Sequence, residues 1–96
     1  MNERFDERLV EFVRGVQAMA AEGVIIETVP GRRYVKLVER DDSIQLRCVH
    51  CFVDRKNGDV LKAATWRAPA KHARGNIFNE DRGLGGVTRH GAKYLR

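Results

Sequence analysis

The stretch that decides the fold is SIQLRCVHCFVDRKNGDVLKAATW, residues 43–66. Its first half mixes β-branched, aromatic and other apolar residues with polar ones, and this pattern predicts the longest strand of the chain at residues 43–53. Asn57-Gly58 then predicts a tight hairpin turn, because both residue types tolerate the positive φ that such a turn requires. A strand from Asp59 to about Trp66 is therefore expected to pair antiparallel with residues 43–53.

Side chains alternate between the two faces of a strand, so residues 43–53 are expected to divide into two sets. Cys48 and Cys51 fall into different sets, which argues against a shared metal ion and against a redox pair. We therefore expect two reduced, buried thiols, no metal and no other cofactor. The set expected to face the core is Ile44, Leu46, Cys48, His50 and Phe52, and the opposite set is Gln45, Arg47, Val49, Cys51 and Val53.

Two further strands are predicted upstream of this hairpin. Residues 24–29 form a β-branched run that ends at the turn pair Pro30-Gly31, and residues 33–40 alternate imperfectly up to a turn at Asp41-Asp42. Short successive turns of this kind join neighbouring antiparallel strands. The chain is therefore expected to form a four-stranded antiparallel meander.

The N-terminal segment, residues 2–22, has the pattern of an amphipathic helix. Its apolar residues recur at spacings of three and four, Asn2 can cap its N-terminus, and Gly23 supplies a stop. The acidic residues on its polar face favour packing on the sheet of the same chain over binding to a membrane. The apolar positions are Phe5, Leu9, Phe12, Val13, Val16, Met19 and Ala20.

These elements define an α+β fold in which the helix packs on one face of the four-stranded meander sheet. We expect one domain over residues 1–96, since a chain of 96 residues has too little interior for a second core. Residues 1–23 supply the helix, residues 24–66 the antiparallel sheet and residues 67–96 a loop-rich basic segment. The face of the sheet without a helix should include Arg47 and be open to solvent or to a ligand.

Positive charge is concentrated in the last third of the chain. The net charge is +5, and residues 62–96 carry eight basic and two acidic side chains. No segment is apolar enough for a membrane span, and the N-terminus lacks the apolar run of a signal peptide. We therefore expect a cytoplasmic protein with no membrane partner, and the charge favours an anionic partner.

The candidate binding site combines an aromatic side chain with basic ones. Trp66 can stack on an unpaired base, and neighbouring cations attract phosphates whatever the base sequence, as in proteins that bind single strands. The predicted function is non-enzymatic binding of single-stranded nucleic acid, with RNA and single-stranded DNA both allowed. The predicted interface consists of Lys62, Trp66, Arg67, Lys71, His72, Arg74, Arg89 and Lys93.

Other interpretations of the same residues stay open. Trp66 can instead be a core residue at the end of a strand, with the charges forming a solvated surface or binding a protein with an acidic surface. Self-association stays open as well, since a small sheet has edges that can pair across a dimer. Catalysis is not expected, because the candidate carboxylates lie at turns or in a polar loop, where they commonly serve local hydrogen bonds. These carboxylates are Asp54, Asp59, Glu80 and Asp81.

The run GDVLKAATWRAPAKHARGNIF, residues 58–78, is preceded by CFVDRKNGD and followed near the C-terminus by HGAKYLR. With these flanks it resembles a family of small proteins encoded by tailed bacteriophages, over residues 49–96. The resemblance implies a phage origin and a location in the cytoplasm of the infected host, and it implies no particular enzymatic activity. Small phage proteins of this size are often single-strand binders or modulators of host factors. The resemblance therefore also allows an alternative function, a protein-interaction module that binds and modulates a host or phage protein.

Overall fold

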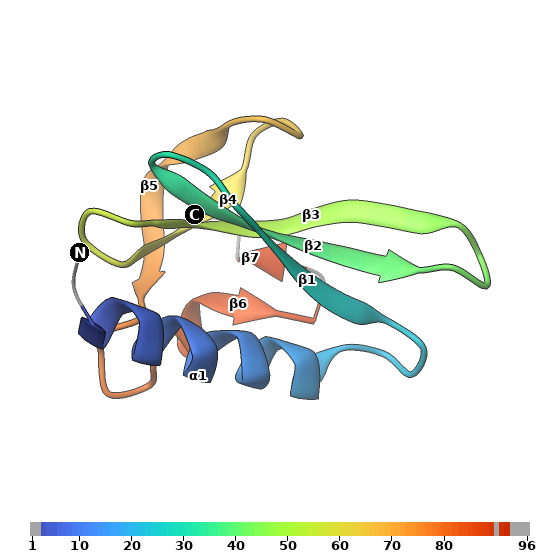
Figure 1. The fold of residues 1–96 in the computed structure, drawn as a ribbon, viewed down its shortest axis with the longest axis horizontal. Helices are drawn as coiled ribbons and strands as arrows, with labels where there is room; N and C mark the ends of the chain where they lie inside the picture. Colours follow the sequence, from blue (N-terminus) through green and yellow to red (C-terminus); the bar gives the residue numbers. More distant parts are fainter. Residues whose placement is uncertain (1–2, 90, 93–96) are drawn as a thin grey trace.

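The fold consists of one N-terminal helix, a curved antiparallel sheet and a short C-terminal hairpin (Figure 1). The computed structural model describes residues 3–89 and 91–92. The helix α1 (Glu3–Met19) is followed by β1 (Ile25–Pro30), β2 (Tyr34–Asp41), β3 (Leu46–Asp54), β4 (Asp59–Ala63) and β5 (Pro69–Asn76). A 3-10 turn, η1 (Leu84–Gly86), then leads into β6 (Val87–Thr88) and β7 (Gly91–Ala92), which pair with each other.

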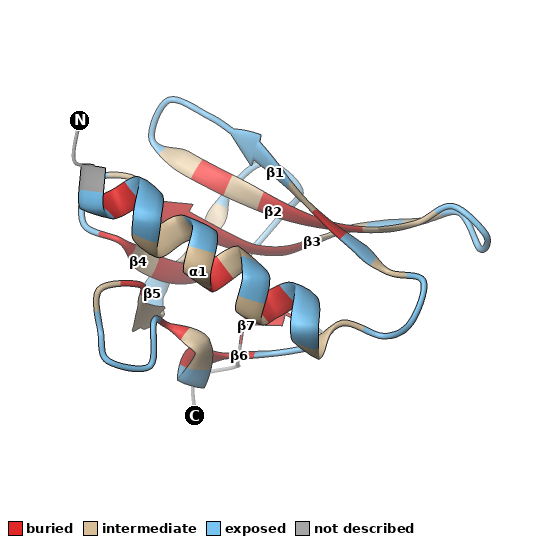
Figure 2. Cartoon of the chain, turned by 60° about the horizontal axis from the view of Figure 1, so that its bottom comes forward, coloured by how far each residue is buried: buried red, intermediate tan, exposed pale blue. Residues whose placement is uncertain are grey.

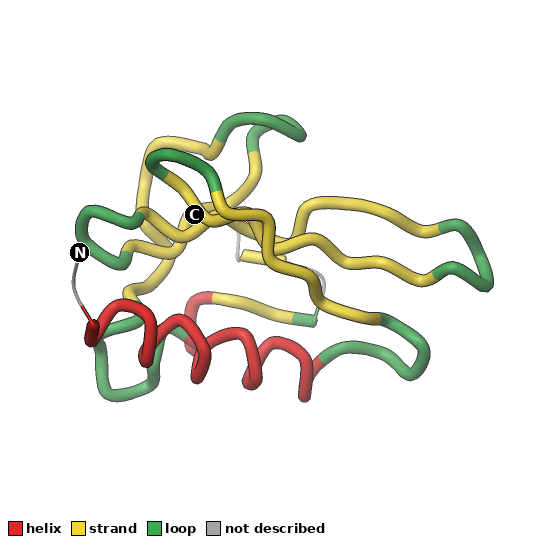
Figure 3. Tube along the Cα trace, viewed as in Figure 1, coloured by secondary structure: helices red, strands yellow, loops and turns green. Residues whose placement is uncertain are grey.

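The sheet is an antiparallel meander with its strands in sequence order, β1-β2-β3-β4-β5. The α1 helix lies along one face of this sheet, as the tube view shows, together with β6 and η1 (Figure 3). The expected α+β fold with a helix packed on an antiparallel sheet is therefore confirmed. The expected strand number is wrong, because the sheet has five strands rather than four.

The fifth strand, β5, occupies residues that were expected to be loop-rich. It lies at the edge of the sheet and pairs with β4 alone, and its register shifts twice, between Val60 and Leu61 and between Leu61 and Ala63. Much of the strand is exposed, so it has no buried set of alternate residues to produce an apolar pattern in the sequence. Pro69 is tolerated because it is the first residue of an edge strand.

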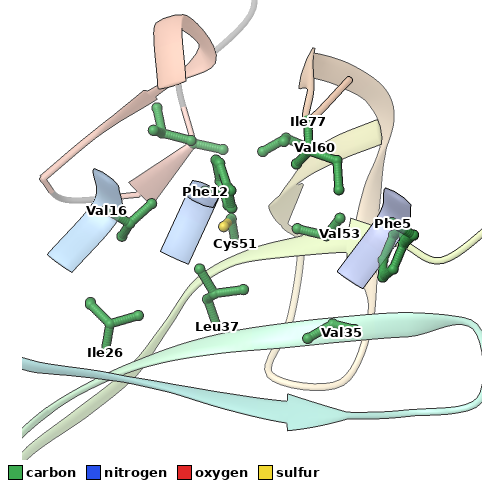
Figure 4. Close-up of a cluster of buried hydrophobic side chains, with 12 residues drawn as sticks. Phe5, Phe12, Val16, Ile26, Val35, Leu37, Cys51, Val53, Val60 and Ile77 are labelled. Carbon is green, nitrogen blue, oxygen red and sulfur yellow. The ribbon is translucent and has the colours of Figure 1, made fainter. Parts of the chain in front are cut away.

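The helix packs through the apolar stripe that its sequence predicts. Phe5, Phe12 and Val16 are buried in one cluster with residues of the sheet, including Leu37 and Cys51 (Figure 4). Figure 2 shows that the buried parts of β2, β3 and β4 lie behind α1, while the outward side of the helix is exposed. Within the described part of the chain, no helix is both long and apolar enough to cross a membrane.

The helix ends at Met19 rather than at the expected Glu22, and Asn2, the expected cap, lies outside the described residues. A side chain of the helix itself forms hydrogen bonds with the segment that follows the helix. The Gln17 amide donates to the Val24 carbonyl at 2.8 Å, and the Ile26 amide donates to the Gln17 side-chain oxygen at 2.8 Å. These two hydrogen bonds connect the last turns of α1 directly to the start of β1.

A β-bulge at His50 interrupts the alternation of β3. Leu37 pairs with Cys51, and the next residue of β2, Val38, pairs with Val49, so His50 is an extra residue on β3. The two halves of β3 consequently differ in which residues face the helix. Cys51 and Val53 belong to the core cluster, whereas Phe52 does not. The expected division of residues 43–53 into two constant sets is therefore wrong from Cys51 onward. It is also wrong at Ile44, which precedes β3 and is 69% exposed rather than core-facing.

The extra residue is itself buried and bonded. The His50 side chain is 2% exposed, its Nε2 lies 2.9 Å from the Thr88 carbonyl oxygen, and its Nδ1 lies 3.2 Å from the Cys51 sulfur. Gly91 of β7 passes so close that a Cβ atom there would lie 2.7 Å from the His50 carbonyl oxygen. The bulge therefore joins the main sheet to the small β6–β7 hairpin.

The predicted turn at Asn57-Gly58 is present between β3 and β4, and Gly58 has a φ of 82°. A Cβ atom on Gly58 would also lie 2.7 Å from the ring of Phe78. We expect Gly58→Ala to lower the free energy of unfolding by about 1–3 kcal/mol, because the left-handed backbone is strained for alanine. Urea denaturation of Gly58→Ala beside Lys56→Ala, an exposed neighbour in the same turn, will measure this. Equal stability of the two variants would contradict the strain argument.

Candidate nucleic-acid interface

The face of the sheet that points away from α1, here called the open face, has a buried apolar floor. Val38, Phe52 and Leu61 are buried, yet they do not belong to the cluster that packs against α1. Phe52 of β3 pairs directly with Leu61 of β4, so these two side chains lie side by side on this face. The floor supports the polar and aromatic side chains that surround it.

Trp66 lies at the edge of the open face, in the connection between β4 and β5. Its side chain is 42% exposed, so Trp66 is a surface residue and not a core residue. The Lys36 Nζ lies 4.4 Å from the centre of the indole ring, and the Arg47 Cζ lies 5.4 Å from it. Trp66 is therefore an exposed aromatic plane with two cations in contact with it.

The loop that carries Trp66 is held by hydrogen bonds within residues 64–68. The Thr65 hydroxyl oxygen accepts from the Arg67 amide at 3.2 Å and from the Ala68 amide at 3.0 Å. The Ala64 amide donates to the Ala68 carbonyl at 3.0 Å. These bonds define the backbone on both sides of Trp66, so the indole is presented on an ordered turn.

The cations around Trp66 are not neutralised by carboxylates. Lys36, Arg47 and Arg67 form no ion pair within the described residues, in contrast to Arg33, which lies 3.2 Å from Asp54, and Arg40, which bonds Glu27. Uncompensated cations beside an exposed aromatic ring are the elements that single-strand binders use for phosphates and bases. The electrostatics of this part of the open face therefore favour an anionic ligand that has a flat ring.

A second aromatic group lies further along the open face. The rings of Tyr34 and Phe52 are 6.1 Å apart between centres and meet edge to face at 73°. The guanidinium carbon of Arg33 lies 5.3 Å from the centre of the Tyr34 ring. The open face thus carries Tyr34 on β2 in addition to Trp66 in the β4–β5 loop.

Some of the residues predicted for the interface come together here, and others do not. Trp66 and Arg67 lie on the open face together with Arg47, which was expected on this face but not in the interface. Lys71 and His72 are exposed on the edge strand β5, and the half-buried Arg74 donates a hydrogen bond to the His72 carbonyl. The predicted residues on β5 therefore form a margin beside the open face rather than its centre.

Two predicted interface residues are placed differently, and a third is not among the described residues. Lys62 follows Leu61, so alternation along β4 directs its side chain toward the face that carries α1. Arg89 lies in the β6–β7 turn on the α1 side, where it lines a hollow together with Glu39 and Asp41. Lys93 lies outside the described residues. Lys62 and Arg89 are thus separated from Trp66 by the sheet.

Sequence reasoning missed Tyr34 and Lys36 as members of the interface. Both residues alternate with Val35 and Leu37, which are buried under α1. The same rule that assigned Arg47 to the open face would have assigned Tyr34 and Lys36 to it. The alternation of residues 33–40 therefore indicates that both side chains lie on the open face.

The bulge at His50 also corrects the expected separation of Cys48 and Cys51. Cys48 pairs with Glu39 and its thiol bonds the Glu39 carboxylate at 3.3 Å, on the same side of the sheet as Cys51. Burial raises the pKa of Cys51, and burial together with the Glu39 contact raises the pKa of Cys48 to about 11. Reactive cysteines have a lowered pKa, so this environment is unlike that of a redox pair.

The raised pKa of Cys48 predicts slow alkylation. Below its ordinary pKa of 9.0 the thiolate is scarce, and a shift to about 11 keeps Cys48 protonated over the intervening pH range as well. Iodoacetamide should therefore modify Cys48 more slowly in the folded protein than in the urea-unfolded protein. The difference between the two absolute rates should be largest between pH 9 and about pH 11, where the unfolded thiol is ionised and the folded one is not. Peptide mapping against time will measure the rate, and equal rates in the two states would contradict the assignment.

Three of the four candidate carboxylates, those of Asp54, Asp59 and Asp81, accept local hydrogen bonds. Asp54 accepts from the Lys56 amide at 2.8 Å, and Asp59 accepts from the Asn76 side chain at 2.9 Å. Asp81 accepts from the amides of Gly83 and Gly85 at 2.9 and 3.1 Å. Among residues 3–89 and 91–92, no group of three or more histidine, cysteine or acidic side chains is arranged to hold a metal ion.

Fold and site together define a small α+β protein in which a helix backs an antiparallel sheet and the opposite face presents aromatic and basic side chains. The chain belongs to a family described as "Family of unknown function (DUF7717)", whose profile matches residues 6–90. The match extends from α1 to the β6–β7 turn and so includes the helix and both N-terminal strands. No curated protein and no solved structure matches the chain.

Proposed function

We propose that the protein binds single-stranded nucleic acid, RNA or DNA, on the open face of its sheet. The observation that carries this proposal is the exposed indole of Trp66, in contact with Lys36 and Arg47, neither of which has an acidic partner within the described residues. A base stacks on the indole, and the cations bind the flanking phosphates. The role proposed is binding without catalysis.

Affinity in this arrangement has two separable sources. Stacking of one base contributes about 1–3 kcal/mol and depends little on salt. Each phosphate bound by a cation adds about 0.7 to the magnitude of the slope of log K against log salt for a single strand. Lys36, Arg47 and Arg67 together would therefore give a slope of about −2 if each binds one phosphate.

The test is a titration with unstructured oligonucleotides over a series of salt concentrations. Trp66 is the only tryptophan in the chain, so indole fluorescence reports directly on the proposed site. We expect the fluorescence to change on binding and the affinity to fall as salt rises. An unchanged indole signal together with no mobility shift at low salt would overturn the proposal.

The salt slope also distinguishes individual cations. We expect Arg47→Gln and Lys36→Gln each to reduce the magnitude of the slope by about 0.7, because each removes one phosphate contact. Arg14→Gln is the matched control, since Arg14 is exposed on α1 and lies on the other side of the molecule. The comparison uses affinities measured at several salt concentrations, and a slope that falls equally in all three variants would point to a diffuse charge effect.

A second candidate function is a protein-interaction module that binds a host or phage protein. The observation that favours it is the other edge of the sheet, where β1 exposes Ile25 and Val29 by 47% and 39%. An exposed strand edge with apolar side chains can pair with a strand of another chain, in a partner or in a second copy. A stoichiometric partner that survives nuclease treatment in a pull-down from host lysate would support this function.

The resemblance to small proteins of tailed bacteriophages adds a biological setting to both candidates. We infer that the protein acts in the cytoplasm of an infected host cell. Expression during infection, followed by mass spectrometry of fractionated cells and of purified virions, tests this setting. Recovery in virions alone would replace it with a role as a virion component.

A further inference from the structure

We propose that the open face holds two adjacent nucleotides in two separate hollows, one at Trp66 and one at Tyr34, with Lys36 at the phosphate between them. This inference rests on the proposed function and specifies the footprint of the ligand. It follows from the shapes and lining of the two hollows and from the position of Lys36 relative to both.

The first hollow lies between β3 and the β4–β5 loop. It has a volume of about 240 Å³, and its wall includes Arg47, Val49, Ala63, Thr65 and Trp66. The lining combines the indole of Trp66 with small or apolar side chains, and the Cζ of Arg47 lies 5.4 Å from the centre of the indole ring. This combination suits a base stacked on Trp66 with a phosphate near Arg47.

The second hollow lies between the β1–β2 turn and the β4–β5 loop. It has a volume of about 300 Å³, and its wall includes Pro30, Arg32, Tyr34, Lys36, Phe52 and Arg67. Tyr34 supplies an aromatic ring, and Arg32, Lys36 and Arg67 supply cations that form no ion pair within the described residues. The second hollow therefore repeats the chemistry of the first, an aromatic group with uncompensated positive charge.

The two hollows have no lining residue in common, yet they are adjacent. Lys36 lines the second hollow, while its Nζ lies 4.4 Å from the ring centre of Trp66, which lines the first. Arg67, in the second hollow, is the next residue in the chain after Trp66. A strand with one base in each hollow would therefore pass Lys36 with the phosphate that links the two nucleotides.

The aromatic rings, in combination with the charge, select the occupant. An acidic peptide would also satisfy the cations, but its carboxylates would leave two aromatic surfaces unused. A nucleic-acid strand alternates flat bases with phosphates, and it satisfies both kinds of group in the order in which the open face presents them. The proposed occupant is therefore a single strand with two bases engaged.

The experiment uses a short oligodeoxynucleotide made of abasic residues, which keeps the phosphates and removes the bases. Versions of it carry no base, one thymine, two adjacent thymines, or two thymines separated by several abasic residues. Affinity is measured through Trp66 fluorescence for the wild-type protein and for Tyr34→Leu and Tyr34→Phe. Leucine keeps an apolar contact with Phe52 but lacks the ring, whereas phenylalanine keeps the ring.

For the wild type we expect the first thymine to tighten binding by about 5- to 150-fold, and an adjacent second thymine to tighten it again within the same range. Separated thymines should gain less than adjacent ones. Tyr34→Leu should keep the first gain and lose the second, and Tyr34→Phe should keep both. Thermal unfolding of the two variants confirms that each is folded.

A wild-type protein that gains nothing from the second adjacent thymine would overturn the two-hollow footprint while leaving single-strand binding in place. The footprint would also be overturned if folded Tyr34→Leu kept the second gain. If no thymine-containing strand binds and an unstructured oligouridine does not bind either, the proposed single-strand binding fails together with the footprint. Because the first result uses the wild type alone, the test does not depend on the stability of a variant.

Discussion

Replacing Trp66 by alanine is expected to weaken binding of an unstructured oligonucleotide by about 5- to 150-fold, which corresponds to the loss of one stacked base. The indole is exposed and offers a flat surface beside Lys36 and Arg47. Alanine removes this surface and leaves both cations in place, so the salt slope should change little. A large loss of affinity with an unchanged slope is the signature of stacking.

Two controls make the result specific for an aromatic contact. Trp66→Phe should retain part of the affinity, because phenylalanine keeps a ring on which a base can stack. Thermal unfolding of Trp66→Ala should be close to that of the wild type, since the side chain is 42% exposed and contributes little to the core. Affinity that is unchanged in Trp66→Ala would exclude stacking and leave a purely basic surface.

Phe12→Ala is expected to have the largest effect on stability, a loss of about 3–5 kcal/mol in the free energy of unfolding. Phe12 is 0% exposed and lies in the core cluster beneath the sheet, close to Cys51 and Leu37 in Figure 4. Truncation to alanine removes a buried ring and leaves a cavity that the surrounding strands fill only in part. A domain of this size has little stability to spare.

Urea denaturation followed by circular dichroism will measure the effect, with Val10→Ala as the matched control. Val10 is on the same helix but is 50% exposed, so its truncation should change stability by less than about 0.5 kcal/mol. If Phe12→Ala were no less stable than Val10→Ala, the helix would not be packed on the sheet as described.

Elements with a strong local pattern could be predicted from the sequence. The stripe of α1 repeats at helical spacing because Phe5, Phe12 and Val16 all face one core, and the Asn57-Gly58 turn is set by local backbone preference. The fifth strand could not be predicted in the same way. β5 is an edge strand with two register shifts and no buried residues. Its pairing with β4 therefore produces no alternation of apolar and polar residues in residues 69–76.

The candidate site could be predicted only where the alternation of side chains between the two faces of a strand applied. Alternation along residues 43–53 assigned Arg47 to the open face, and the aromatic and basic composition of the segment after β4 pointed to Trp66 and Arg67, which lie beside it. Arg89 was expected in the interface because it is basic and close to the C-terminus. The chain crosses to the α1 side after β5, however, and amino-acid composition cannot predict such a crossing. Lys36 reaches Trp66, and Tyr34 shares a hollow with Arg67, through strand pairing over a long sequence separation, and this can be known only from the sheet register.

The bulge at His50 makes β3 sensitive to its residue count as well as to its residue types. Cys48 and Cys51 are three residues apart, and they lie on the same side of the sheet only because His50, between them, is an extra residue in the ladder. If β3 kept all its residues but paired without the bulge, inside and outside would be exchanged along half of its length, which would send either Cys51 and Val53 or Cys48 toward the open face. The extra residue between the two cysteines therefore keeps the inward-facing residues of both halves of β3 on the α1 side, and the open face on the other side, along the whole strand.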